Sequence, residues 1–226
     1  MGMIFGKIDV EQASHTILPH TFGPDATDVQ LRKYDAHVLA RVPASKVNEN
    51  AQFRVLAKYI GVFGQPENTN TAADGDNGGN GGSKIAMTAP VLSSTSSSQS
   101  SPQKIAMTAP VLSSTSSSSH SDMAFVLPAQ YKTSADAPTP TDVRVELINV
   151  SERHVAVKTF SGLVTMETAE KMANEFKQSL EEQGFQTKTW QLARYNPPFT
   201  LWFLRTNEIW MDVDSDSLPP FNNSNL

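Results

Sequence analysis

The segment 193–211, ARYNPPFTLWFLRTNEIWM, contains the densest aromatic group of the sequence. Pro197 and Pro198 stiffen this connection and keep the preceding residue out of the helical region. Phe199 and Trp202 follow at once on the stiffened loop. Such a loop can fold its aromatic side chains onto the core, or it can form a wall beside an apolar cleft that takes a flat hydrophobic ligand. Both interpretations fit the composition.

A second candidate for a cleft wall is the apolar segment that starts at Asn48, a good N-cap, and ends near Gly61. Its spacing predicts a helix with two apolar rows. The first row is Phe53, Leu56, Ala57 and Ile60, and the second is Ala51, Val55, Tyr59 and Val62. One row is enough to pack on a sheet. The second either widens the core contact, which is common in small α+β domains, or forms one wall of a ligand cleft.

Other catalytic or metal chemistry finds little support. The sequence has no cysteine, so thiolate nucleophiles and thiolate metal ligands are excluded. No two of its five histidines have the i, i+4 spacing of a helical metal pair. No P-loop, GxSxG, GxGxxG or HExxH motif occurs, and serines are abundant only in low-complexity sequence that cannot hold a fixed base. We therefore expect no enzyme, no catalytic residue and no metal site.

Charge and targeting signals favour a cytosolic protein. The 226 residues carry a net charge of -5, with lysine and arginine scattered along the chain, so nucleic-acid binding is disfavoured. The N-terminal segment lacks the long apolar region of a secretory signal. No apolar run approaches the ~18 residues of a membrane span. We expect a protein without a transmembrane segment and favour a monomer.

The elements that position these residues are read from hydrophobic periodicity. Strands are predicted in the segments 15–23, 28–35, 37–44, 123–128, 143–150, 153–162, 185–195 and 206–214. A second helix is predicted from Thr165 to Gln183, with Gly184 just past its end. The order is strands, helix, strands, and then the same again. This order predicts an α+β fold of two similar halves that share one core.

The phrase KIAMTAPVLSSTSSS occurs twice, at 84–98 (copy one) and at 104–118 (copy two). We predict that copy two, Lys104 to Val111, forms the strand beside the segment 123–128, because copy one would need a much longer connection. The predicted domain then spans 1–214. It is interrupted by a low-complexity disordered insertion at about 65–103 and by a Ser-rich loop at 113–121, and 215–226 is a flexible tail.

Several phrases together resemble the SOUL / p22 heme-binding protein family, most closely its cytosolic plant-type members. They are MGMIFGKI, QLRKY, AKYIGVFGQPEN, KIAMTAPV, MAFVLP, FSG and ARYNPPFT…RTNEIW. The resemblance implies a distorted antiparallel β-barrel or curved sheet of about eight or nine strands with two helices in pseudo-symmetric halves. It also implies reversible binding of heme, or of porphyrins without iron, in a shallow apolar cleft beside the first helix.

The resemblance also implies which residues contact the tetrapyrrole. They are Phe53, Leu56, Ala57, Lys58 and Ile60 on the helix and Pro197, Pro198, Phe199 and Trp202 on the aromatic loop. Lys58 matches a basic residue that faces the heme propionates, although a lysine near a helix C-terminus is also favoured by the dipole. Some animal members have a histidine before the tyrosine of the second strand, but this chain has Lys33 before Tyr34. We therefore predict no dedicated axial histidine.

The leading hypothesis is a cytosolic carrier or buffer that passes heme to a recipient protein. The main alternative is a protein-interaction or regulatory module with a phosphorylatable Ser/Thr-rich loop. An enzyme acting on a tetrapyrrole is a third option, for which the sequence supplies no acid, base or fixed metal ligand.

Overall fold

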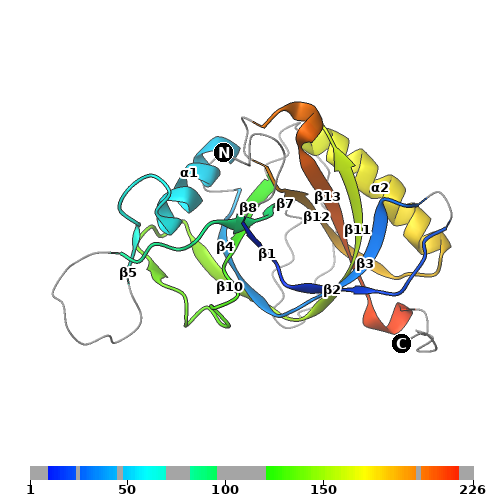
Figure 1. Ribbon diagram of the computed structural model, residues 1–226, viewed down its shortest axis with the longest axis horizontal. Coiled ribbons are helices and arrows are strands. Elements are labelled where there is room, and N and C mark those ends of the chain that lie inside the picture. Colours follow the sequence, from blue (N-terminus) through cyan, green and yellow to red (C-terminus); the bar gives the residue numbers. More distant parts are fainter. Residues whose placement is uncertain are drawn as a thin grey trace, which may run out of the picture.

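The computed structural model describes residues 10–23, 26–44, 48–69, 82–95, 121–196 and 200–218 (Figure 1). Nine strands form one curled antiparallel sheet. These strands are β2 (His15–Leu18), β3 (Val29–Tyr34), β4 (His37–Val42), β7 (Val91–Thr95), β8 (Ser121–Val126), β10 (Glu146–Val150), β11 (Arg153–Ser161), β12 (Thr187–Arg194) and β13 (Thr206–Val213). The predicted α+β fold with a curved antiparallel sheet is confirmed.

Two short pairs lie outside this sheet. Strand β1 (Glu11–Gln12) pairs in parallel with β6 (Thr88–Ala89), and β5 (Asn68–Thr69) pairs with β9 (Thr139–Pro140). The first pair brings the start of the described chain beside copy one of the repeated phrase.

The strand order shows the two halves. It runs β10-β4-β8-β7-β12-β13-β11-β3-β2, so the middle of the symmetric part lies between β7 and β12. On one side β7, β8 and β4 belong to the first half, and on the other β12, β13 and β11 repeat the arrangement. The next strand outward is exchanged: β10 of the second half pairs with β4, and β3 of the first half pairs with β11. The predicted pseudo-symmetry is therefore confirmed.

Each half carries one helix, and both helices lie where the sequence predicts them. Helix α1 (Glu49–Ile60) begins after Asn48, whose side chain accepts a hydrogen bond from the Ala51 amide at 3.0 Å. It ends at Gly61, whose φ of 84° is a left-handed conformation that glycine adopts without steric cost. Helix α2 (Met166–Glu182) begins after the N-cap Thr165.

Alternation along the strands divides the core into two layers. In β4, Val38 and Ala40 pack in the cluster that contains α1, whereas Leu39 packs in a cluster on the other face of the sheet. In β13, Met211 packs with α2, whereas Trp210 lies on the other face. Both helices therefore cover one face of the sheet, and the opposite face has an apolar cluster of its own.

The prediction that copy two forms the sheet strand is wrong. Strand β7 comes from copy one and pairs with both neighbours, with Val91 opposite Phe125 of β8 and opposite Arg194 of β12. Copy two lies outside the described residues. Residues 82–95, which the prediction assigned to the disordered insertion, thus form β6 and the central strand β7.

The physical reason lies in the residues that precede each copy, since the copies themselves are identical. Asn68 is buried and donates to the carbonyls of Tyr59 (2.7 Å) and Ser83 (2.9 Å), while its Oδ1 accepts from the Ser83 amide at 2.8 Å. A Cβ on Gly82 would lie 2.5 Å from the carbonyl oxygen of Asn68, so only glycine fits there. Copy two is preceded by Pro102 and Gln103 instead. The longer loop costs little, because loop-closure entropy grows slowly with length.

A Gly82→Ala variant is therefore expected to lose about 1–3 kcal/mol of the free energy of unfolding, because backbone must move to accept the methyl group. Urea denaturation followed by circular dichroism measures the loss. Ser83→Ala is the matched control, since the bonds between Ser83 and Asn68 use only the Ser83 backbone. An unchanged midpoint for Gly82→Ala would show that this backbone contact does not select copy one.

Candidate functional site

A cleft of about 670 Å³ lies beside α1, over the seam between the two halves. Its floor is one cross-strand row, in which Phe125 of β8, Val91 of β7 and Arg194 of β12 stand next to one another. Its lining residues are Val10, Asn50, Phe53, Arg54, Phe63, Met87, Thr88, Ala89, Val91, Met123, Phe125, Arg194, Tyr195, Asn196 and Arg205. The volume falls in the range of small-molecule sites.

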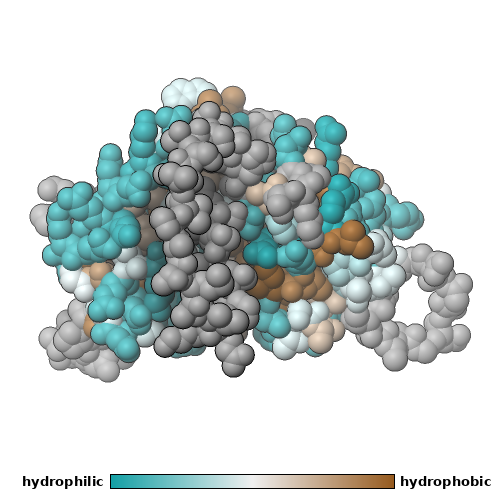
Figure 2. Space-filling model, turned by 180° about the vertical axis from the view of Figure 1, so that it is seen from behind, coloured by the Kyte–Doolittle hydropathy of each residue, from teal (hydrophilic) through white to brown (hydrophobic). Residues whose placement is uncertain are grey.

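One apolar side chain of α1, Phe53, contacts the floor of the cleft. Phe53 is partly buried and meets Phe125 edge to face, with ring centroids 5.6 Å apart. Phe63, just past the helix, leaves 62% of its surface exposed, and Met87 leaves 36% exposed. Figure 2 shows one face of the molecule, on which hydrophobic residues gather in one region among hydrophilic ones. An exposed aromatic and a thioether at the rim of an apolar cleft offer contact area to a flat hydrophobic ligand.

The charged side chains in the described lining of the cleft are all positive. Arg54, Arg194 and Arg205 line it, and its described lining includes no aspartate or glutamate. Arg194 donates to Ser93 Oγ at 3.0 Å, and Arg205 donates from Nε to the Thr200 carbonyl at 3.0 Å, which fixes both guanidinium stems. In a chain of net charge -5, three positive charges gathered along one described lining favour an anionic ligand.

Asn196 adds an unsatisfied donor to the same lining. Its Oδ1 accepts a hydrogen bond from the Thr206 amide at 2.7 Å, whereas its Nδ2 is buried and has no hydrogen-bond partner among the described residues. A buried amide donor without an acceptor is costly. A ligand carboxylate at this end of the cleft would satisfy it, so the donor set fits the propionates of a heme.

Tyr195 connects the cleft to a buried polar network on the helix-free face of the sheet. Its hydroxyl donates to Glu208 Oε2 at 2.5 Å. Glu208 also accepts from the Arg32 guanidinium at 2.9 and 3.2 Å and from Trp210 Nε1 at 2.7 Å. Because the buried carboxylate is paired and its oxygens are bonded, the network holds Tyr195 in one orientation.

Burial shifts the titrations of this network. It raises the pKa of Tyr195, and the negative charge of Glu208 raises it further, so the hydroxyl stays protonated. Burial likewise raises the pKa of Tyr34 to about 12. For Arg32 burial is the largest single cause and lowers the pKa, but the charge of Glu208, together with Tyr34 and the hydrogen bonds to both side chains, outweighs it, so the net pKa is raised.

The sequence-predicted helix residues separate in the structure. Phe53 lines the cleft, whereas Leu56, Ala57 and Ile60 are buried in the core and do not line it. Lys58 is exposed and pairs with Glu67 at 2.9 Å, outside the cleft lining. The second apolar row also joins the core through Val55 and Tyr59, which agrees with the wide-arc alternative. The cleft wall on α1 is instead Asn50, Phe53 and Arg54, spaced i, i+3 and i+4.

The aromatic loop is only partly described. Pro197, Pro198 and Phe199 lie outside the described residues. Trp202 begins a short 3₁₀ turn (Trp202–Leu204), is exposed, and packs edge to face on Phe203 at 5.6 Å. It does not line the cleft, but Arg205, which follows this turn, does.

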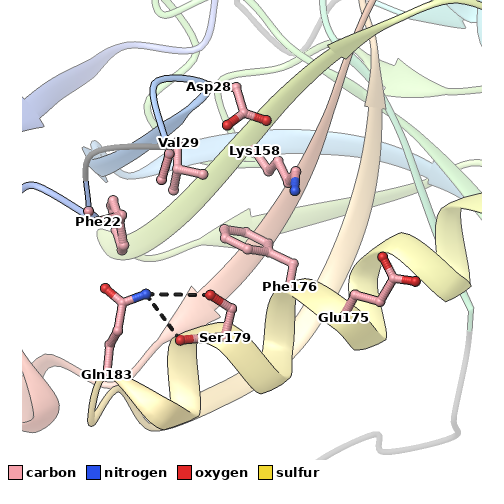
Figure 3. A pocket seen from close by; sticks show the side chains of 10 residues that line it. Phe22, Asp28, Val29, Lys158, Glu175, Phe176, Ser179 and Gln183 are labelled. Carbon is pink, nitrogen blue, oxygen red and sulfur yellow. Dashed lines mark hydrogen bonds between the residues drawn. The ribbon is translucent and has the colours of Figure 1, made fainter.

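A second, smaller cavity of about 340 Å³ lies beside α2 (Figure 3). Phe22 and Phe176 form its apolar part, and Gln183 is turned back to donate to Ser179. Lys158 shares this lining with Asp28 and Glu175, so charges of both signs face it. This cavity lacks the uniform sign of the cleft beside α1.

The described residues hold no group of three histidine, aspartate or glutamate side chains that could bind a metal ion. No described histidine lines the cleft. His37 is buried with Nδ1 2.7 Å from the Asp35 carbonyl, and burial lowers its pKa. His20 packs edge to face on Phe22 and Phe185, in the cluster that contains α2. Neither described helix is long and apolar enough to cross a membrane.

Sequence reasoning missed the arginines. Arg54, Arg194 and Arg205 are far apart in the sequence, and only the pairing of β7 with β12 and the packing of α1 bring them to one cleft. The available signal was Arg205 at the end of the aromatic loop and Arg54 one residue after Phe53 on the helix.

Two pseudo-symmetric halves with an apolar, donor-lined cleft at their seam define a small-molecule binding protein of the α+β class. A family model described as SOUL heme-binding protein matches residues 10–103 and 95–212. The two matches together cover most of the chain, so this protein belongs to the SOUL heme-binding protein family. Heme or a related tetrapyrrole is accordingly the class of ligand.

The solved structures that this chain matches are distant in sequence. A hydrolase from Listeria innocua is 10% identical, with 85% of this chain and 94% of that chain covered and a TM-score of 0.46. The C-terminal domain of EcmrR is 10% identical, with 82% and 96% covered and a TM-score of 0.43. A putative transcription regulation protein from Staphylococcus aureus is 12% identical, with 83% and 98% covered and a TM-score of 0.40. No curated protein matches the chain.

Proposed function

We propose that this protein binds heme or a related porphyrin reversibly in the cleft beside α1 and acts as a cytosolic tetrapyrrole carrier or buffer. The observation that carries the proposal is the donor set: three arginines and the unpartnered Asn196 amide surround an apolar cleft whose described lining has no acid. A tetrapyrrole with carboxylate side chains matches both parts, because its face needs a dry apolar wall and its carboxylates need donors.

Reversible exchange is consistent with the openness of the site. Phe63 and Met87 remain exposed at its rim, so a ligand held there keeps contact with solvent. No described histidine reaches the cleft, which removes the strongest type of iron anchor. The proposed contacts are therefore Phe53, the arginines and Asn196, with the aromatic loop at the mouth.

Titration with hemin, followed by absorption in the Soret region, tests this proposal. We expect saturable binding, and a Phe53→Gln variant should weaken it about tenfold, since one aromatic contact is lost. Leu56 is unsuitable for this test, because it is fully buried and a polar group there would unfold the helix contact. Leu163→Gln is the control, since Leu163 is 69% exposed and lies outside the cleft.

Absence of saturable binding would contradict the proposal and favour the interaction module. One feature supports that alternative: Leu201, Trp202 and Phe203 form an exposed apolar turn beside the cleft-lining Arg205. Such a turn is typical of contact surfaces. A hemin titration that saturates identically in Phe53→Gln and wild type would place the ligand elsewhere on the molecule.

A further inference from the structure

The cleft offers few atoms that could coordinate an iron. Heme iron in proteins takes histidine nitrogen, cysteine or methionine sulfur, or tyrosine oxygen as axial ligand. The chain has no cysteine, and no described histidine lines the cleft. The donors that remain in its described lining are Tyr195, Met123 and Met87.

Tyr195 and Met123 are poorly placed for this role. The Tyr195 hydroxyl donates to Glu208 at 2.5 Å, and the side chain is only 8% exposed. Coordination would require a phenolate beside the Glu208 carboxylate, and two negative charges so close repel each other. Met123 is 4% exposed and packs in the core cluster beneath α1, so it offers a ligand far less surface than Met87 does.

Met87 is both accessible and anchored. Its side chain lines the cleft and is 36% exposed. On one side of it, the Ile85 amide donates to the Ile60 carbonyl at the end of α1, at 3.1 Å, and the Ile85 side chain is buried. On the other side, Thr88 pairs with Glu11 of β1 and its hydroxyl donates to the Val126 carbonyl. The backbone is fixed at both ends while the flexible thioether remains free to adjust to a ligand.

We propose that the Met87 sulfur is the axial ligand of an iron porphyrin bound in this cleft. The inference rests on the proposed function, because it assigns a donor to the same ligand. A thioether is a soft, neutral donor and stabilises the ferrous state over the ferric state. Ferrous heme is thus expected to bind more tightly than ferric heme, and the coordination requires no proton or electron from the protein.

Anaerobic titrations with ferrous heme and with metal-free protoporphyrin test the assignment in wild type and Met87→Leu. Leucine conserves volume and removes the sulfur. We expect the affinity for ferrous heme to fall about tenfold or more, while the affinity for metal-free protoporphyrin stays within about twofold. The absorption and resonance Raman spectra of the ferrous complex should also lose the signature of the thioether ligand.

The repeated phrase provides a matched control. Met107 occupies the same place in copy two as Met87 in copy one, so Met107→Leu makes the same chemical change in an identical local sequence. It should leave the ferrous spectrum unchanged. If Met107→Leu removes the ligand signature instead, or if Met87→Leu leaves both the spectrum and the ferrous affinity unaltered, the assignment to Met87 is overturned.

The same titrations separate this inference from the function on which it rests. Binding of protoporphyrin and heme that is indifferent to Met87→Leu overturns the ligand assignment and leaves tetrapyrrole binding intact. Absence of binding of either tetrapyrrole overturns both.

Discussion

Replacing Arg32 with methionine is expected to lower the free energy of unfolding by about 3–5 kcal/mol, because the change leaves the Glu208 carboxylate buried without its counter-ion. The two side chains are 9% and 6% exposed, and the guanidinium contacts both carboxylate oxygens. Tyr195 and Trp210 still donate to the carboxylate in the variant, but neutral donors do not replace a full positive charge. Urea denaturation with an unchanged m-value measures the loss.

The neighbouring residue provides the control for this variant. Lys33 follows Arg32 in β3 and pairs with Glu152 at 2.9 Å, but the two side chains are 38% and 53% exposed. Lys33→Met should therefore cost no more than about 1 kcal/mol. In the double variant Arg32→Met/Glu208→Gln the buried charge is removed together with its partner, and part of the stability should return. Equal losses for Arg32→Met and Lys33→Met would show that the buried pair has no special role.

The second large effect is expected on ligand affinity. Changing Arg54, Arg194 and Arg205 to glutamine together should weaken the binding of a dicarboxylate porphyrin at least about 100-fold, since each hydrogen bond to a charged group contributes about 1.5–3 kcal/mol. Affinity of the wild type should also fall as salt is added. Titration with protoporphyrin measures the effect. Its dimethyl ester is the comparison ligand, because it has no carboxylates for the arginines to bind.

Two further variants serve as controls for this experiment. Lys171→Gln, on the exposed face of α2, removes a positive charge far from the cleft and should change nothing. Lys58→Gln tests the role that the family resemblance gives to that lysine, which the structure pairs with Glu67. If Lys58→Gln loses as much affinity for protoporphyrin as the arginine variant, Lys58 and not the arginines binds the carboxylates. If the arginine variant loses as much affinity for the dimethyl ester as for protoporphyrin itself, the arginines act through the fold and not through their charge.

The fold was largely predictable from the sequence, whereas the site was not. Local signals determine the helices: Asn48 and Thr165 are N-caps, and Gly61 supplies the left-handed residue that ends α1. Apart from β7, periodicity predicts each strand of the symmetric part of the sheet, because one face is buried against a helix. Which residues line the cleft depends instead on contacts between segments that are distant in the sequence. Helical spacing placed Phe53 and Leu56 in one row, yet the first lines the cleft and the second is in the core.

The choice between the repeated phrases was also beyond local reasoning. Loop length favoured copy two, but the deciding contact is the approach of Gly82 to the Asn68 backbone, which joins residues that no short motif connects. The three arginines show the same limit, because composition recorded them as scattered and the pairing of β7 with β12 brings them together.

The exchange of outer strands between the halves has a consequence for folding. Strand β10 completes the sheet of the first half beside β4, and β3 completes the sheet of the second half beside β11. Neither half is therefore a self-sufficient unit: a polypeptide cut between them would expose an unpaired strand edge on each piece. The chain must be nearly complete before the nine-stranded sheet can form, so folding is cooperative over the whole domain and slow because its decisive pairings are non-local.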